Sequence, residues 1–208
     1  MELSKQKNYQ QSFDLACASF KGIDLKERAE KSGAVYEQGS EEEQILLSFF
    51  SEPYTLRFPQ IEFSSPGKKT VSLVTRALVL HYLLKADGSA LTGEWVAYKD
   101  LPGGLLYASV FARRVTDPLI ERFGSSAQLF REVAVRFRGE SAEVGDASVK
   151  LLALPRVPMQ YVLWEGDEEF PASAQLLFDS SVIHYLPLED IVVLGQITTG
   201  RLISLSKR

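Results

Sequence analysis

The sequence predicts an α+β fold, in which a small, mostly antiparallel sheet packs with several helices around a central buried helix at about residues 70–85. Segments with apolar side chains at helical spacing are mixed with short segments in which apolar and polar side chains alternate. The predicted helices and strands do not alternate regularly along the chain, as they would in a doubly wound α/β sheet. At 208 residues, with no long linker, the chain fits a single domain over residues 1–208.

The N-terminal part is expected to form two helices and then several short strands. Residues 5–20 place apolar side chains at helical spacing, and Gly22 can end that helix in the left-handed conformation. Asp24 can cap a second helix over residues 25–31, which Gly33 ends. Short strands are predicted at residues 35–36, 45–50, 54–58 and 60–63, with turn residues between them.

The strongest helix signal lies at residues 70–85, where apolar side chains cover most of the helix girth. Such a helix is buried on most sides, so we expect it at the centre of the fold. Beyond it, the pattern predicts a strand at residues 95–98, helices at 105–114, from about 118 and at 127–137, and a loop bracketed by Gly139 and Gly145.

The C-terminal part predicts two strands, residues 149–154 and 157–164, that pair antiparallel across a short turn. Residues 173–178 can form either a short strand or a helical turn. A short helix is then expected to residue 186, followed by a helix over residues 189–205 that is interrupted near Gly200.

The composition restricts the classes of partner. With 23 basic and 27 acidic side chains the net charge is −4, so the chain lacks the basic surface that nucleic acid or an anionic membrane would attract. No apolar run reaches the ~18 residues of a membrane span, and the N-terminus lacks the apolar core of a signal peptide. We therefore expect a cytoplasmic protein without nucleic-acid or membrane partners.

The chain has one cysteine, Cys17. A single cysteine cannot form an internal disulfide, and it cannot hold an iron–sulfur cluster alone. Because a free cysteine packs as a small hydrophobic residue, we expect Cys17 to be buried on its helix.

The densest group of chemically capable side chains is an acidic turn, residues 165–169, between Trp164 and Phe170. Its carboxylates, joined by Asp146, Asp179 or Glu189, supply the oxygen ligands that a hard divalent cation prefers. The metal candidates among these residues are Asp167, Glu169 and Asp179. The spacing matches no EF-hand loop, so a solvated turn without metal is the alternative. We expect the two flanking aromatic residues to hold the ends of the turn in the core.

Two histidines and one arginine are further candidates. His81 and His184 each follow apolar residues on a predicted helix, where a buried, hydrogen-bonded side chain is one interpretation. The other is a general base or metal ligand, with His184 paired to Asp179. Arg156 can bind an anionic ligand or pair with the acidic turn and hold it shut, and we favour the pairing.

Several motifs occur in order along the chain: Leu101-Pro102-Gly103-Gly104, Leu154-Pro155-Arg156-Val157-Pro158, Trp164–Pro171 and Phe178-Asp179. Over roughly residues 10–195 they resemble a family of uncharacterised single-domain proteins from anaerobic bacteria and archaea. The resemblance implies no assigned activity, although some members are fused to an iron–sulfur domain and some occur in corrinoid and one-carbon settings. This chain departs from the fused members, because Cys17 alone cannot hold a cluster.

Three functions follow as hypotheses. The first, which the resemblance favours, is a non-enzymatic ligand-binding or accessory protein in anaerobic metabolism of the one-carbon or corrinoid type, with an unknown small molecule or protein as its partner. The second is an enzyme that uses carboxylates and His184 with a divalent metal. The third is an interaction module whose acidic surface docks a basic protein. The candidate ligand or pocket residues are Trp95, Tyr98, Tyr107, Arg156, Trp164, Asp167, Glu168, Glu169, Asp179 and His184.

Overall fold

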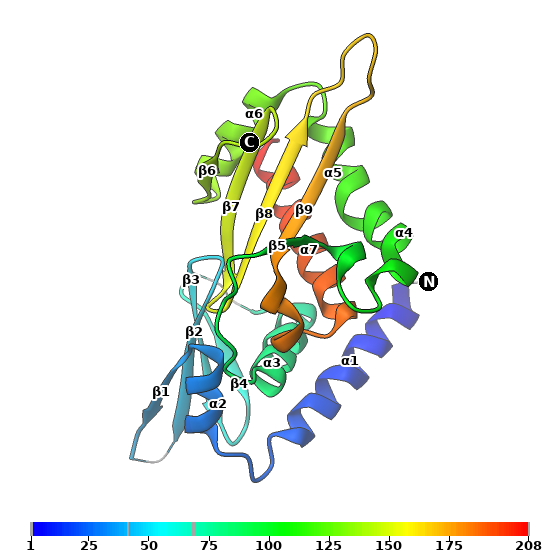
Figure 1. Cartoon of the computed structure of the whole chain (residues 1–208). Coiled ribbons are helices and arrows are strands. Elements are labelled where there is room, and N and C mark those ends of the chain that lie inside the picture. The colour runs from blue at the N-terminus through cyan, green and yellow to red at the C-terminus, as the bar shows by residue number, and fades with distance from the viewer. Residues whose placement is uncertain (1, 41, 68–69, 208) are drawn as a thin grey trace. The chain divides into compact units, whose positions relative to one another are not determined.

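The computed structural model describes residues 2–40, 42–67 and 70–207 (Figure 1). Within these residues it confirms the α+β class, with two antiparallel sheets, of four and five strands, where the sequence indicated one. The chain divides into two compact units. Unit 1 comprises the chain up to Ala90 together with Leu154–Arg156 and His184–Pro187, and unit 2 comprises Leu91–Ala153, Val157–Ile183 and the chain from Leu188 onwards.

Unit 1 contains helices and the four-stranded sheet, whose strand order is β1-β2-β3-β4. Its elements are α1 (Glu2–Ser19), α2 (Leu25–Ser32), β1 (Val35–Gln38), β2 (Glu43–Phe49), β3 (Glu52–Phe58), β4 (Glu62–Ser64) and α3 (Leu73–Lys85). The two local signals at α2 act as the sequence predicts. The Asp24 side chain accepts a hydrogen bond from the Glu27 N–H at 3.0 Å, and Gly33 ends the helix with φ of 69°.

Alternation of side chains along the strands creates the buried face of this sheet. Ile45, Leu47 and Phe49 of β2 are buried, whereas the residues between them are only partly buried. Antiparallel pairing places Ile45 opposite Leu56 and Leu47 opposite Tyr54, so the apolar side chains of β3 join the same face.

The central buried helix of the prediction is α3. It begins after Ser72, whose hydroxyl accepts a hydrogen bond from the Thr75 N–H at 3.2 Å. Residues 77–80 are four consecutive buried positions, and such positions point to all sides of a helix. The Tyr82 hydroxyl donates to the Ser32 carbonyl at 2.5 Å and accepts from the Arg156 N–H at 3.0 Å, which ties α3 to two other segments of unit 1.

Unit 2 contains the five-stranded sheet, in the order β5-β9-β8-β7-β6, with helices against it. Its elements are β5 (Trp95–Ala97), η1 (Tyr98–Asp100), η2 (Gly104–Tyr107), α4 (Ala108–Phe111), η3 (Ala112–Thr116), α5 (Asp117–Phe123), α6 (Ala127–Arg136), β6 (Glu140–Ala142), β7 (Ala147–Leu154), β8 (Val157–Trp164), β9 (Ser173–Asp179), η4 (Ser180–His184) and α7 (Leu188–Leu205). None of the helices in the described residues combines the length and the apolar character that crossing a bilayer requires.

Helix α7 packs on the sheet of unit 2 through β8. The buried Tyr161 hydroxyl lies 3.3 Å from the Gly195 carbonyl oxygen and 2.9 Å from the Thr199 Oγ1. Gly195 also permits the close approach of α7 to η3, since a Cβ added there would lie 3.0 Å from a methyl group of Val115.

Three predicted elements differ from the observed ones. Helix α7 runs through Gly200 without the expected interruption, because the burial of apolar residues such as Leu194 and Leu202 outweighs the ~1 kcal/mol helix cost of a glycine. The expected loop after Gly139 contains the short edge strand β6, which pairs with β7. The single helix expected at residues 105–114 is a succession of 3₁₀, α and π turns, η2, α4 and η3.

Candidate functional site

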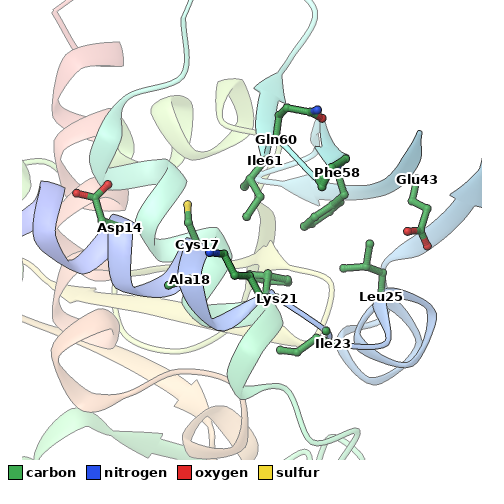
Figure 2. Close-up of a pocket in the computed structure, with 13 residues that line it drawn as sticks. Asp14, Cys17, Ala18, Lys21, Ile23, Leu25, Glu43, Phe58, Gln60 and Ile61 are labelled. Atoms are coloured by element: carbon green, nitrogen blue, oxygen red, sulfur yellow. The ribbon is translucent and has the colours of Figure 1, made fainter. Parts of the chain in front are cut away.

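A pocket of about 600 Å³ opens in unit 1 between the end of α1 and the sheet (Figure 2). Three segments line it: the end of α1 with the loop that leads to the first residue of α2, the start of β2, and the end of β3 with the turn to β4. The lining residues are Asp14, Cys17, Ala18, Phe20, Lys21, Gly22, Ile23, Leu25, Glu43, Phe58, Pro59, Gln60 and Ile61.

The end of α1 positions one wall of the pocket. The Phe20 N–H donates to the Cys17 carbonyl at 3.2 Å and the Lys21 N–H donates to the Ala18 carbonyl at 3.3 Å, so the helix tightens as it ends. Gly22 then turns the chain with φ of 77°, a conformation that favours glycine. This turn holds the side chains on both sides of it against the opening.

The floor of the pocket is apolar. Phe20, Leu25, Phe58 and Ile61 are each less than 10% exposed, and Figure 2 shows Leu25, Phe58 and Ile61 converging on the space beside α1. The rings of Phe20 and Phe58 lie 5.4 Å apart, which joins the helix wall to the sheet wall. A ligand that covers this floor would gain affinity from apolar burial.

The rim of the pocket is polar and exposed. Asp14 Oδ1 accepts a hydrogen bond from Gln10 Nε2 at 2.8 Å, and Glu43 Oε1 accepts one from the Tyr36 hydroxyl at 2.7 Å. That hydrogen bond raises the pKa of Tyr36.

Cys17 is half-buried, because its side chain lines the pocket instead of lying within the core as the sequence predicted. Burial, and after it the nearby Asp14 carboxylate, raise the pKa of the Cys17 thiol, while Arg76 offsets part of the rise. The sulfur is therefore a neutral thiol at pH 7, which is a weak nucleophile.

The aromatic residues expected to wall one pocket are not brought together. Trp95 pairs with Asp179 at one end of β9, whereas Trp164 pairs with Ser173 at its other end. Six residues of strand separate these positions by about 20 Å. Tyr98 is in the core of unit 2, with its ring stacked on Phe111 at 4.4 Å, whereas Tyr107 is 47% exposed.

The acidic turn faces solvent. Glu168 and Glu169 are exposed, and Phe170 is 67% exposed, so the expectation that Phe170 anchors the turn in the core is wrong. Trp164 is half-buried. Asp167 Oδ1 accepts hydrogen bonds from the N–H groups of Phe170 at 2.7 Å and Glu169 at 2.8 Å, and these bonds lower the pKa of Asp167. The turn is thus organised by its own backbone.

Asp146 and the first residue of the turn, Glu165, also have structural partners. Asp146 Oδ2 accepts a hydrogen bond from the Glu165 N–H at 2.7 Å. The Glu165 carboxylate in turn accepts one from the N–H of Ala127, the first residue of α6. Glu165 therefore caps a helix N-terminus, where a negative charge is favourable.

Asp179 is a buried carboxylate that is saturated with donors. Its oxygens accept hydrogen bonds from the N–H groups of Thr92, Gly93 and Ser181 and from two hydroxyl groups, at 2.6–3.1 Å. Burial alone would raise the pKa of Asp179, but the hydrogen bonds from Ser181, Thr92 and Gly93 outweigh it and lower the pKa to about 2.

Neither His184 nor Arg156 contacts its expected partner. His184 Nδ1 lies 2.7 Å from Asp87 Oδ2 on the surface of unit 1. Its partner is therefore Asp87, and the expected partner was Asp179. The expected pairing of Arg156 with the acidic turn is wrong, because Arg156 precedes β8 and the turn follows it. The eight residues of β8 span about 25 Å. His81 Nε2 lies 3.1 Å from Ser12 Oγ, in line with a structural histidine.

The described residues contain no cluster of three or more His, Cys, Asp or Glu side chains that could hold a metal ion. The metal candidates Asp167 and Asp179 instead accept the hydrogen bonds described above. Sequence reasoning missed the pocket residues, although one local signal was present. Phe13, Cys17 and Phe20 recur at spacings of four and three, which places Cys17 on the packed face of α1.

A comparison with protein families matches residues 24–201 to the family described as "Domain of unknown function (DUF3786)". The match includes the α2 and sheet side of the pocket, and the α1 residues precede it. No curated protein sequence and no solved structure matches the chain. The family match covers most of the chain, so this protein belongs to the DUF3786 family.

Proposed function

We propose that this protein is a non-enzymatic binding protein that holds a small, largely apolar organic molecule in the pocket of unit 1. The observation that carries this proposal is a cavity of about 600 Å³ with a buried apolar floor and a polar rim. Pockets that bind small molecules have this composition and typically measure ~300–1,000 Å³.

The chemistry of the lining supports binding more than catalysis. The described lining residues include no histidine, the commonest general base. The Cys17 thiol in the pocket has its pKa raised and is protonated at pH 7, so it is a weak nucleophile. An accessory role in anaerobic metabolism of the one-carbon or corrinoid type remains part of the proposal and is supported by the motif resemblance alone.

A panel of neutral apolar probes tests the proposal: phenylbutanol, decanol and naphthylmethanol. Because the chain has one cysteine and it lines the pocket, alkylation of Cys17 by iodoacetamide reports occupancy directly. We expect at least one probe to slow the alkylation and to raise the thermal midpoint, since a ligand at ~100 Kd adds about 2.7 kcal/mol of stability. If no probe at millimolar concentration does either, the proposal is wrong.

A pair of variants at the end of α1 locates the binding. Ala18 is exposed and lines the pocket, whereas the adjacent Ser19 is exposed and does not. We expect Ala18→Trp to block the mouth and abolish the calorimetric heat of probe binding, while Ser19→Trp leaves it unchanged. Equal binding by both folded variants would place the bound probe elsewhere and contradict the proposal.

The outward acidic turn favours a second candidate, an interaction module that docks a basic protein. The exposure of Glu168, Glu169 and Phe170 supports it. Its test is the binding of a basic peptide alternating lysine and leucine, measured by fluorescence anisotropy. We expect Glu168→Lys combined with Glu169→Lys to abolish binding if the turn is the docking surface, and unchanged binding would remove this candidate.

A further inference from the structure

We propose that the molecule held in the unit 1 pocket is an organic acid, whose carboxylate pairs with the Lys21 ammonium while its apolar body covers the floor. This inference rests on the proposed function, because it names the chemical class of the ligand for the same pocket. The choice of ligand class depends on which charged side chains of the rim have no hydrogen-bond partner within the protein.

The charged groups of the rim differ in their partners. Asp14 and Glu43 each accept a hydrogen bond from a neighbouring side chain. The Lys21 side chain, by contrast, makes no hydrogen bond or ion pair with any described residue. Its ammonium carries three N–H donors. This exposed donor is therefore available to a ligand, and a carboxylate offers two acceptor oxygens with a complementary charge.

A second cation lies near the same end of the pocket. The Arg76 guanidinium lies 4.7 Å from the ring centre of Phe13, and its positive charge acts on the Cys17 thiol. Its buried Nε has no hydrogen-bond partner in the described residues. In Figure 2 the Lys21 side chain extends towards Cys17. At the Cys17 thiol the positive charge of Arg76 is opposed by the larger effect of the Asp14 carboxylate, so Lys21 is the cation that the pocket itself presents.

Two features of the rim favour a cationic ligand over an anionic one. The rim carries two carboxylates, Asp14 and Glu43, and the C-terminal carbonyls of α1 add partial negative charge. However, the Cys17 and Ala18 carbonyls already accept backbone hydrogen bonds, as the two carboxylates accept side-chain bonds. The groups that attract a cation are thus partly satisfied, whereas the Lys21 ammonium has no partner among the residues that the structure describes.

The expected gain in affinity from the ion pair with Lys21 follows from the exposure of this side chain. Ion pairs at exposed sites change affinity by about two- to fivefold, and salt weakens them. The apolar floor therefore supplies most of the affinity. The Lys21 ammonium then favours the ligand with a carboxylate among ligands of similar shape.

Three probes with one apolar body separate the head groups: phenylbutanoate, phenylbutanol and phenylbutylamine. We expect calorimetry at pH 7.5 and low salt to rank phenylbutanoate tightest, by about two- to fivefold over phenylbutanol, and phenylbutylamine weakest. Lys21→Gln should abolish the preference for phenylbutanoate over phenylbutanol. Lys26→Gln is the matched control, because Lys26 is exposed nearby on α2 and does not line the pocket.

The outcomes distinguish this inference from the proposed function. If phenylbutanol binds and phenylbutanoate binds no tighter, or if phenylbutylamine binds best, the carboxylate assignment is wrong while the binding function stands. Equal loss of preference in Lys21→Gln and Lys26→Gln would also overturn it, since a general charge effect would then explain the ranking. If neither these three probes nor decanol and naphthylmethanol bind, the proposed function itself fails.

Discussion

The Asp179 carboxylate illustrates how one side chain joins segments far apart in the sequence. Its oxygens bind N–H groups of Thr92 and Gly93, almost ninety residues earlier, and of Ser181, two residues later. Because the carboxylate is buried, these N–H groups replace the hydrogen bonds that water would otherwise donate to its oxygens. Asp179 is therefore a structural residue of unit 2, where the sequence suggested a ligand or a metal site.

Asp179→Asn is expected to lower the free energy of unfolding by about 2–3 kcal/mol at pH 7, because hydrogen bonds to a charged group are worth roughly that amount. The folded pKa of about 2 lies below the ordinary value near 3.9. The contribution of Asp179 is therefore complete above about pH 5 and is lost as the pH falls towards 2. Urea unfolding from pH 2 to 7 measures this, and we expect the difference between wild type and variant to shrink at low pH.

Asp167→Asn is the matched control for this experiment. Asp167 is exposed and accepts two backbone hydrogen bonds, which an asparagine side-chain oxygen can also accept. We expect no measurable change in its unfolding midpoint at pH 7. A loss in Asp179→Asn that persisted unchanged at pH 2 would contradict the role assigned to the charge.

At the scale of elements, the turn at residues 101–104 shows why a short glycine-containing segment is structural. The Gly104 N–H donates to the Leu101 carbonyl at 2.8 Å, and Leu101 N–H donates to the Tyr98 carbonyl at 3.2 Å. The structure shows the backbone of this turn closed on itself, with Gly104 packed against the Tyr98 carbonyl.

Gly104→Ala is expected to destabilise the protein by about 1–3 kcal/mol, the usual cost of overpacking. A Cβ at this position would collide with the backbone oxygen of Tyr98, which cannot rotate away. Gly200→Ala in α7 should instead raise stability by up to ~1 kcal/mol, because it removes a helix-interior glycine and no atom lies within 4 Å of the new Cβ. Thermal unfolding of both variants checks the pair, and equal midpoints would refute the packing argument.

At the scale of the whole molecule, the pocket belongs to unit 1 alone, since all its lining residues lie in that unit. Hydrogen exchange with saturating phenylbutanol should therefore slow in the amides of the last turn of α1, the start of β2 and the β3–β4 turn. A bound molecule stabilises the native contacts around it, so the local opening that exposes these amides becomes rarer. Slowing confined to other elements would show that the probe binds outside the pocket.

Much of the secondary structure was predictable from the sequence, because it depends on residues close together in the chain. The cap Asp24 and the stop Gly33 bound α2. Apolar side chains around most of the helix surface identified α3 as buried. The turn at Pro155-Arg156 separated β7 from β8. The strand β9 was left open because residues 173–178 are too short a segment for their periodicity to separate a strand from a helical turn.

The candidate site was far less predictable. The sequence drew attention to the acidic turn because its charges are adjacent, but Asp167 and Glu165 bind backbone N–H groups and the turn points to solvent. It drew attention to Trp95 and Trp164 because pockets are often aromatic, but strand register separates them along β9. Residue type alone therefore selected candidate site residues that the fold does not bring together.

The sequence by itself determined the α+β class, the boundaries of most helices and strands, and membership of the DUF3786 family. Only the tertiary structure decided that the apolar residues build two sheets, that Asp179 binds residues 92 and 93, and that the end of α1 meets the β3–β4 turn around a cavity. The physical reason is the distance along the chain over which each interaction acts. Caps, turns and periodicity act between neighbours, whereas a pocket arises where segments distant in sequence pack and leave space, which depends on the burial of the whole chain.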